Sequence, residues 1–194
     1  TNAARANTTS RWAHAAPPSI PFGTLAFEPC TLAHEQLALT VSARCATLRV
    51  PEDRARPEGR MLDLPVAWIP SSANKPSDDP VVLLAGGPGQ SALDAYPTLA
   101  AAFQPLLRER DVILVDQRGT GRASTLACPR TVDDPRWQGG AEVADPATAR
   151  EIAQACLDEI SDADPRFYTT SDYVADLEAA RRALGVARFN LVGV

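Results

Sequence analysis

The chain has 194 residues, of which 45% are hydrophobic and 22% charged, as is usual for a folded globular domain. Its 19 basic and 24 acidic residues give a formal net charge of −5 with no basic run, which excludes the charge pattern of a nucleic-acid-binding protein. No apolar run approaches the ~20 residues needed to span a bilayer, and no signal pattern opens the chain, although a signal could already have been removed.

The N-terminal part predicts an extension followed by a hairpin. Residues 1–24 are rich in small and polar residues without periodicity, which indicates an extension that drapes over the domain or stays mobile. Residues 43–50 and 61–69 are strand-like and are joined by a polar connection, so they predict an antiparallel hairpin. Pro65 favours an edge position for the second of these strands.

The stretch from residue 81 to residue 116 predicts a parallel crossover. Residues 81–84 are all Val or Leu and predict a buried strand that ends in a glycine-rich loop at 85–89. Residues 111–116 form a second buried run, and the spacing between the two runs fits a strand-helix-strand unit. The helix is predicted over 96–108 from an apolar stripe of Leu99, Ala102, Phe103, Leu106 and Leu107.

Two further helices and a strand are predicted beyond this unit. Apolar spacing predicts helices over 147–160 and 171–184, and Gly185 marks the end of the second. Residues 189–194 predict another buried strand. The whole pattern predicts a mostly parallel, doubly wound α/β sheet preceded by an antiparallel hairpin. The inward residues of the helix at 171–184 are expected to be Val174, Leu177, Ala180 and Leu184.

The glycine loop has two functional interpretations, of which the first is dinucleotide binding. Residues 87–92 satisfy the G-x-G-x-x-A pattern after a strand, and Asp116 ends the next strand, where a ribose hydroxyl would bind. Against this, Pro88 removes a backbone N–H from a loop that would donate such groups to pyrophosphate. A P-loop is excluded because no Gly-Lys-Ser or Gly-Lys-Thr follows the glycines.

The second interpretation is acyl transfer, in which a glycine loop donates an N–H to an oxyanion and a nucleophile follows a later strand. The segments AGGPG at 85–89, DQRGTGRAS at 116–124 and NLVGV at 190–194 resemble, in order, those of the α/β-hydrolase peptidases of the prolyl aminopeptidase and tripeptidyl aminopeptidase family. That family combines a (H)GGPG loop, a DQRGxGxS loop and a G-x-S-x-G nucleophile elbow. The resemblance implies an α/β-hydrolase fold, with residues 25–194 as the N-terminal part of its catalytic domain.

The resemblance also implies roles for residues in the first two loops. It implies that the backbone N–H of Gly86 is an oxyanion donor, with Gly87 as the second choice. It implies that Asp116, Gln117 and Arg118 brace the adjacent loop. The donor fork of an arginine favours hydrogen bonds within the protein over contact with substrate at Arg118.

The catalytic triad of an α/β-hydrolase runs Ser, then Asp or Glu, then His along the chain. His14 and His34 both precede the first core strand, so neither is expected to be the base, and no cluster has metal-ligand spacing. Neither Ser91 nor Ser124 is nominated as a nucleophile. The resemblance implies that the nucleophilic Ser follows Val194 immediately, and that a C-terminal remainder of the protein supplies the triad.

The four cysteines allow three pairings into two disulfides. Comparable local bridges in the secreted branch of the family imply that Cys30 pairs with Cys45 and Cys128 with Cys156. Disulfides form in oxidising compartments, so we expect a secreted or periplasmic protein. The alternative is a cytoplasmic enzyme with four buried free thiols.

The function predicted from these features is that of a serine aminopeptidase, which releases N-terminal residues or short peptides through an acyl-enzyme. Its substrate would be a peptide or an ester, and no cofactor is implied. A carboxylesterase of the same fold, a nicotinamide-dinucleotide oxidoreductase domain and a catalytically silent binding domain are the alternatives, because a fold alone does not fix a function.

Overall fold

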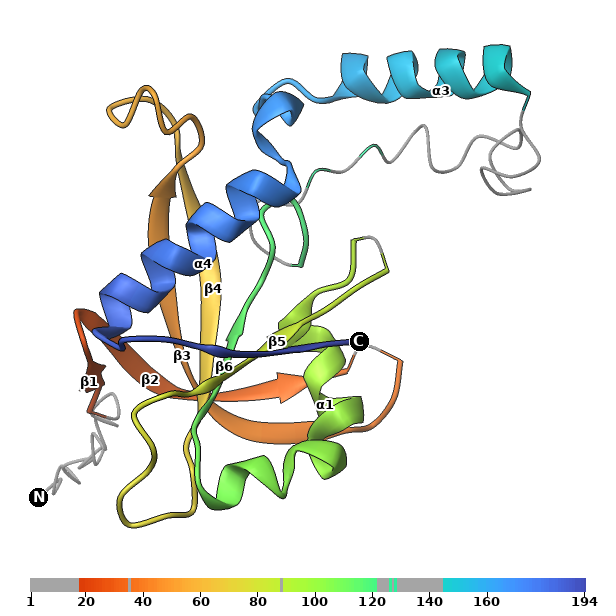
Figure 1. The fold of residues 1–194 in the computed structure, drawn as a ribbon. Coiled ribbons are helices and arrows are strands. Elements are labelled where there is room, and N and C mark those ends of the chain that lie inside the picture. Colours follow the sequence, from red (N-terminus) through yellow and green to blue (C-terminus); the bar gives the residue numbers. More distant parts are fainter. Residues whose placement is uncertain (1–17, 35, 88, 122–125, 127, 129–144) are drawn as a thin grey trace, which may run out of the picture.

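The computed structural model describes residues 18–34, 36–87, 89–121, 126, 128 and 145–194. Its centre is a seven-stranded sheet in the order β1-β2-β3-β4-β6-β5-β7 (Figure 1). The strands are β1 (Ile20–Phe22), β2 (Leu25–Ala33), β3 (Thr40–Pro51), β4 (Met61–Ile69), β5 (Val81–Leu84), β6 (Val112–Val115) and β7 (Asn190–Gly193).

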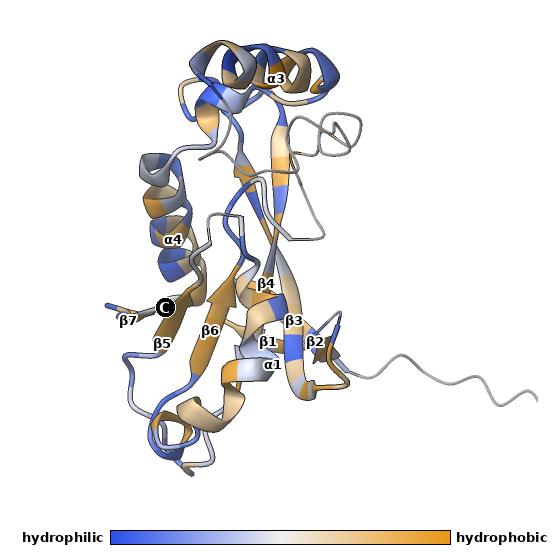
Figure 2. Ribbon diagram, turned by 90° about the vertical axis from the view of Figure 1, so that its right-hand side faces the viewer, coloured by the Kyte–Doolittle hydropathy of each residue, from blue (hydrophilic) through white to orange (hydrophobic). Residues whose placement is uncertain are grey.

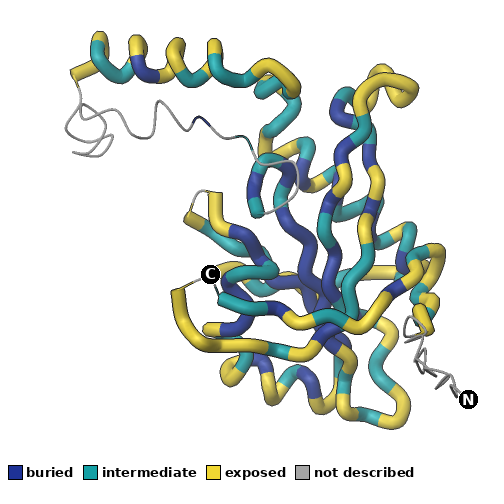
Figure 3. The backbone as a smooth tube through the Cα atoms, turned by 180° about the vertical axis from the view of Figure 1, so that it is seen from behind, coloured by how far each residue is buried: buried dark blue, intermediate teal, exposed yellow. Residues whose placement is uncertain are grey.

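Two helices cover opposite faces of this sheet (Figure 2). Because successive side chains of a strand point to opposite faces, Val81 and Leu83 pack on the side of α1, whereas Val82 packs on the side of α4. Residues of the central strands are therefore buried on both faces (Figure 3). The helical elements are α1 (Ala92–Phe103), η1 (Leu106–Arg108), α3 (Pro146–Glu159), η2 (Pro165–Phe167) and α4 (Thr170–Leu184).

The sheet is mixed. Strands β5, β6 and β7 pair in parallel, and α1 is the crossover between β5 and β6. The hairpin predicted at 43–50 and 61–69 is present as β3 and β4, and the pairings from β1 through β4 to β6 are all antiparallel. This combination of a parallel crossover region with N-terminal antiparallel strands agrees with the α/β sheet preceded by a hairpin that the sequence predicts.

The antiparallel part begins earlier than the sequence indicates. Strand β1 lies within the predicted extension, at residues 20–22, and pairs with β2. Thr24 then fixes the turn to α4, because its backbone N–H and its hydroxyl both donate to the carbonyl of Ala183, at 2.7 and 3.0 Å. Residues 1–17 of the predicted extension lie outside the described residues.

The edge position predicted from Pro65 is wrong, because β4 lies between β3 and β6. Strand β4 tolerates the proline because the ladder with β6 ends there. Val66 is paired with Val115, and beyond it Asp116 N donates to Pro65 O at 3.2 Å, while the return bond from Pro65 cannot form. The missing N–H therefore costs one hydrogen bond at the end of the ladder.

The predicted inward stripes of two helices need correction. Helix α1 starts at Ala92, four residues before the prediction, and Ala102 is exposed. In α4 the buried residues are Tyr173, Asp176, Ala180 and Leu184, so the inward face is rotated and Val174 is 60% exposed. The rotation brings the carboxylate of Asp176 into the core, where it pairs with Arg118.

Strand β7 is less covered than the buried run at 189–194 predicts. In the described residues it pairs with β5 alone, and Leu191 is 58% exposed. Beside it lies a cavity of about 320 Å³ with a largely apolar lining that includes Leu84, Val174 and Phe189.

Both predicted disulfides are present in the structure. Cys30 and Cys45 join neighbouring strands β2 and β3 beneath α1, where they pack against the core. Cys128 and Cys156 join the chain after β6 to α3, across 28 residues. None of the described helices is long and apolar enough to cross a membrane.

The end of α4 carries an ion-pair cluster that makes stability depend on pH. Glu178 accepts hydrogen bonds from Arg181 and Arg182, both at 2.7 Å, and these bonds lower the pKa of Glu178 from 4.5 to about 2. Because the folded-state pKa lies below the unfolded value, the carboxylate stabilises the fold above about pH 4.5, and this contribution is lost as the pH falls to about 2.

We predict that Glu178→Gln flattens the dependence of unfolding free energy on pH between about pH 4.5 and about pH 2. The measurement is urea unfolding of the intact protein at a series of pH values. Glu58→Gln, at an exposed position in the connection between β3 and β4, is the control. Equal slopes for the wild type and Glu178→Gln would contradict the prediction.

Candidate active site

Three segments that are distant in the sequence meet where the parallel strands end. Strands β5, β6 and β7 run in the same direction, so the glycine loop after β5, the loop after β6 and the residue after β7 lie at one edge of the sheet (Figure 1). In open α/β sheets this carboxyl edge is where ligands bind. The structure therefore places the two predicted loops and Val194 together.

The glycine loop contacts the end of β7 through backbone atoms. Val194 N donates to Leu84 O at 3.3 Å, which extends the pairing one residue past β7. A Cβ atom on Gly86 would lie 2.7 Å from Val194 O, closer than a real Cβ approaches any atom. Position 86 must therefore be glycine for the two segments to come this close.

The rest of the loop turns back toward α1. Gln90 N donates to Gly86 O at 3.2 Å, which closes the turn. Gly87 has a φ of +125°, a conformation that residues with a Cβ rarely adopt. Both glycines named as oxyanion donors thus occupy positions that need glycine, whereas Pro88 lies outside the described residues.

Asp116 connects the end of β6 to the start of α1. Its side chain is 2% exposed, and Oδ1 accepts hydrogen bonds from Ser91 Oγ at 2.9 Å and from Leu93 N at 3.1 Å. Burial raises the pKa of Asp116, while the hydrogen bonds from Leu93 and Ser91 act in the opposite direction. The loop after β6 is thereby tied to the residue that follows the glycine loop.

These contacts argue against the dinucleotide interpretation. The ribose hydroxyl would need the carboxylate of Asp116, which Ser91 and Leu93 already use. Pyrophosphate would need the first free N–H groups of α1, but Leu93 N donates to Asp116 and Asp94 N donates to Ser91 Oγ at 3.0 Å. The geometry leaves this helix N-terminus without the donors that the motif requires.

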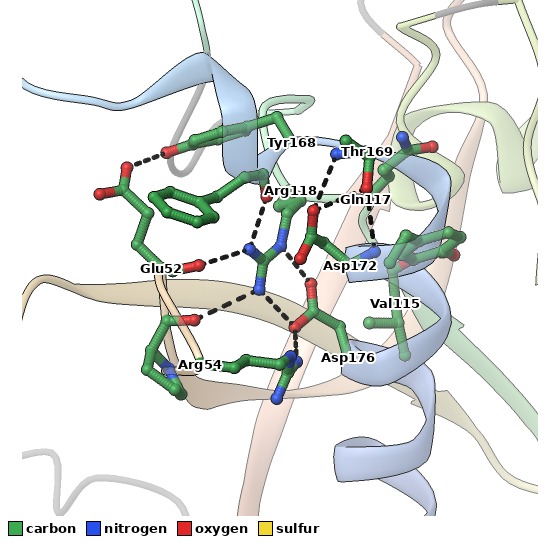
Figure 4. Close-up of polar contacts among 12 residues, drawn as sticks. Glu52, Arg54, Val115, Gln117, Arg118, Tyr168, Thr169, Asp172 and Asp176 are labelled. Carbon is green, nitrogen blue, oxygen red and sulfur yellow. Dashed lines mark hydrogen bonds and ion pairs between the residues drawn. The ribbon is translucent and has the colours of Figure 1, made fainter. Parts of the chain in front are cut away.

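Arg118 is the most extensively bonded side chain of the candidate site (Figure 4). Its Nε and Nη2 form a bidentate pair with Asp176, both at 2.7 Å. Nη1 donates to Glu52 O at 2.9 Å and to Phe167 O at 2.7 Å, and Nη2 also donates to Pro51 O at 3.3 Å. A guanidinium has five N–H donors, so none remains for a substrate.

A wider polar network surrounds this pair. Arg54 forms a second hydrogen bond to Asp176 Oδ1. The carboxylate of Glu52 accepts from Tyr168 OH at 3.1 Å and from Asp164 N at 3.0 Å. The network therefore connects the loop between β3 and β4 with η2 and α4.

The other residues considered in the sequence analysis make local contacts or lie outside the described residues. Gln117 contributes its backbone carbonyl, which accepts from Thr120 N at 3.0 Å and closes the turn after β6. His34 Nδ1 accepts from two backbone N–H groups of its own loop, both at 3.2 Å. His14 and Ser124 lie outside the described residues, and within the described ranges no group of His, Cys, Asp and Glu could hold a metal ion.

Sequence reasoning missed Asp176 and Glu52, the partners of Arg118. The helical spacing could have identified Asp176. It lies three residues after Tyr173 and four before Ala180, so all three share the inward face of α4. A carboxylate in such a stripe needs a buried partner. For Glu52 no comparable signal exists, because its backbone carbonyl makes the contact and any residue could supply it.

Comparison with known proteins gives the following matches. Residues 79–194 match the family model described as alpha/beta hydrolase fold. The tripeptidyl aminopeptidase of Streptomyces coelicolor is 28% identical over 168 residues, which cover 78% of this chain and 30% of that protein. Carboxylesterase B of Mycobacterium tuberculosis is 29% identical over 154 residues, which cover 73% of this chain and 29% of that protein.

A crystal structure of proline iminopeptidase from Mycobacterium smegmatis is similar with a TM-score of 0.43 and 21% identity, covering 76% of this chain and 34% of that chain. The chain spans 30% of the length of the tripeptidyl aminopeptidase and 29% of the length of carboxylesterase B.

We predict that Arg118→Lys destabilises the intact protein by about 2–5 kcal/mol, because an ammonium group cannot reproduce the bidentate pair and leaves buried acceptors unpaired. The exposed Arg182→Lys, which also loses a carboxylate contact, should cost about 0–1 kcal/mol. Urea unfolding of both variants measures the difference. Equal destabilisation of the two variants would contradict the structural importance of the Arg118 contacts.

Proposed function

Because this chain belongs to the alpha/beta hydrolase fold family, we propose that it acts within a longer serine hydrolase that cleaves peptides through an acyl-enzyme. The observation that supports this proposal most strongly is the contact between Gly86 and Val194. If the residue after Val194 is a serine, its hydroxyl lies next to the N–H groups of the glycine loop. An acyl-transfer site needs this arrangement of nucleophile and oxyanion donors.

The proposed mechanism assigns a backbone role to this chain. The serine oxygen attacks the substrate carbonyl carbon while its proton passes to a histidine base supplied by the remainder of the protein. The carbonyl oxygen becomes an oxyanion, which accepts a hydrogen bond from Gly86 N, with Gly87 N as the second candidate. Collapse of the intermediate expels the amine, which takes the proton, and water then hydrolyses the acyl-enzyme by the same route.

The proposed role of Asp116, Gln117 and Arg118 is to brace the loop beside the glycines. The saturated donors of Arg118 support bracing over substrate contact. The buried carboxylate of Asp116 supports the same role, because its described partners belong to the protein itself.

The proposed substrate class is inferred from the activities of the similar proteins. A tripeptidyl aminopeptidase and a carboxylesterase match at similar identity, so both activities are candidates, and we favour the aminopeptidase on the combination of the GGPG and DQRG loops. The disulfides Cys30–Cys45 and Cys128–Cys156 support an oxidising compartment, outside the cell or in the periplasm.

The C-terminal remainder of the same protein is the proposed partner of the exposed side of β7. Leu191 is 58% exposed there, and it lines an apolar cavity together with Val174 and Phe189. An apolar surface of this kind needs a cover in a stable protein.

The test of the function uses the intact protein with a serine-directed fluorophosphonate, a tripeptide chromogenic amide with a free α-amino group, its N-acetylated counterpart and a short p-nitrophenyl ester. An aminopeptidase is labelled and cleaves the free peptide much faster than the acetylated one. An esterase is labelled and cleaves the ester alone. An unlabelled and inactive protein would refute the proposal.

We predict that Gly86→Val lowers kcat of the intact enzyme by about 10²-fold or more, because the new side chain collides with Val194 O and moves the proposed oxyanion donor. KM should change less, since the substrate is also held elsewhere. Ala187→Val, an exposed position before the start of β7, is the control for adding a β-branched residue. An unchanged kcat in a folded Gly86→Val enzyme would remove Gly86 from the site.

A further inference from the structure

We propose that Asp116 and Ser91 act together as positioning residues that hold the described part of the glycine loop, Gly86, Gly87, Gly89 and Gln90, at the end of β6. The inference rests on the proposed function, because it assigns these residues to the loop that would bind the oxyanion. Neither residue is proposed to touch the substrate.

The contact joins two segments that are 25 residues apart in the sequence. Ser91 Oγ lies 2.9 Å from each oxygen of the Asp116 carboxylate. A hydroxyl has one hydrogen to donate, and the oxygen of Ser91 also accepts from Asp94 N at 3.0 Å. The orientation of the hydroxyl is therefore fixed by β6 on one side and by α1 on the other.

Both partners of this contact are buried. Asp116 is 2% exposed and Ser91 is 6% exposed, so loss of either partner removes one hydrogen bond from a buried polar group that water cannot readily replace. The loop after β6 adds a steric limit, since a Cβ atom on Gly121 would collide with Asp116 Oδ2. The backbone at Gly121 therefore lies against the Asp116 carboxylate, and a side chain at this position would displace it.

Helix capping alone does not explain the carboxylate. Ser91 is already the N-cap of α1, and its hydroxyl accepts from Asp94 N. Asp116 adds a second acceptor from a neighbouring strand, which takes Leu93 N at 3.1 Å. Because Asp116 lies outside the helix, its hydrogen bond with Leu93 N fixes the position of the start of α1 relative to the end of β6.

The constraint reaches the glycine loop directly. Ser91 follows Gln90, and Gln90 N donates to Gly86 O at 3.2 Å. The loop is thus held at its far end by Asp116 and at its near end by the hydrogen bond from Val194 N to Leu84 O. Release of the far end should let the Gly86 amide move, and small displacements of catalytic groups reduce turnover strongly.

The experiment compares Asp116→Ala, Ser91→Ala and the double variant in the intact enzyme. Each single variant should lower kcat by about 10-fold or more with KM changed by less than about 2-fold. The double variant should be no worse than the more impaired single variant, because both changes remove the same contact. Hydrogen exchange should speed up at the amides of residues 84–95. Ser91→Ala keeps the test decisive if Asp116→Ala does not fold.

Asp145→Ala is the matched control, since Asp145 caps the N-terminus of α3 through Ala147 N and Thr148 N and lies outside the proposed site. It should lower stability by a similar mechanism and leave kcat unchanged. Effects of Asp116→Ala and Ser91→Ala that multiply, an unchanged kcat, or an equal loss in Asp145→Ala would overturn the inference.

Hydrogen exchange separates this inference from the proposed function. If the wild type neither hydrolyses the substrates nor reacts with fluorophosphonate, the proposed function fails. Exchange at residues 84–95 still tests the positional constraint in that case, and exchange that is identical in the wild type and Asp116→Ala would overturn it.

Discussion

The buried pair of Arg118 and Asp176 is the interaction on which the arrangement of this chain depends. Its two charges are removed from water, which is unfavourable unless every hydrogen-bonding group is satisfied. The structure satisfies the guanidinium completely, with the Asp176 carboxylate and three backbone carbonyls. One side chain thereby joins the end of β3, the loop after β6, η2 and α4, which belong to four separate parts of the sequence.

This pair also explains the orientation of α4. If the helix followed its apolar spacing alone, Val174 and Leu177 would point inward. Instead Asp176 lies in the inward stripe at 0% exposure, and Val174 is 60% exposed. Asp176 thus takes the inward position, where Arg118 and Arg54 pair with it, and Val174 lies instead in the lining of the apolar cavity beside β7.

Sequence reasoning succeeded where the local pattern and the tertiary structure agree. The runs at 81–84 and 111–116 are buried on both faces, so their apolar content alone identifies them, and Gly185 ends α4 with a φ of +69°. It failed where long-range contacts decide. Strand β2 contains Pro29 and has only two buried residues, Phe27 and Leu32, so its alternation is broken and its pairing with β3 is not evident in the sequence.

The two polar anchors of the candidate site lie on opposite faces of the sheet. Asp116 reaches α1, and Arg118, only two residues further, reaches α4. In a continuous strand these two side chains would share a face. They separate because β6 ends at Val115 and a turn follows, closed by Thr120 N and the carbonyl of Gln117 at 3.0 Å. Residues 116–118 are thus held from both faces of the sheet, which restrains the backbone where β6 ends. The proposed oxyanion site would depend on restraint of this kind, because backbone N–H donors cannot be reoriented by side-chain rotation.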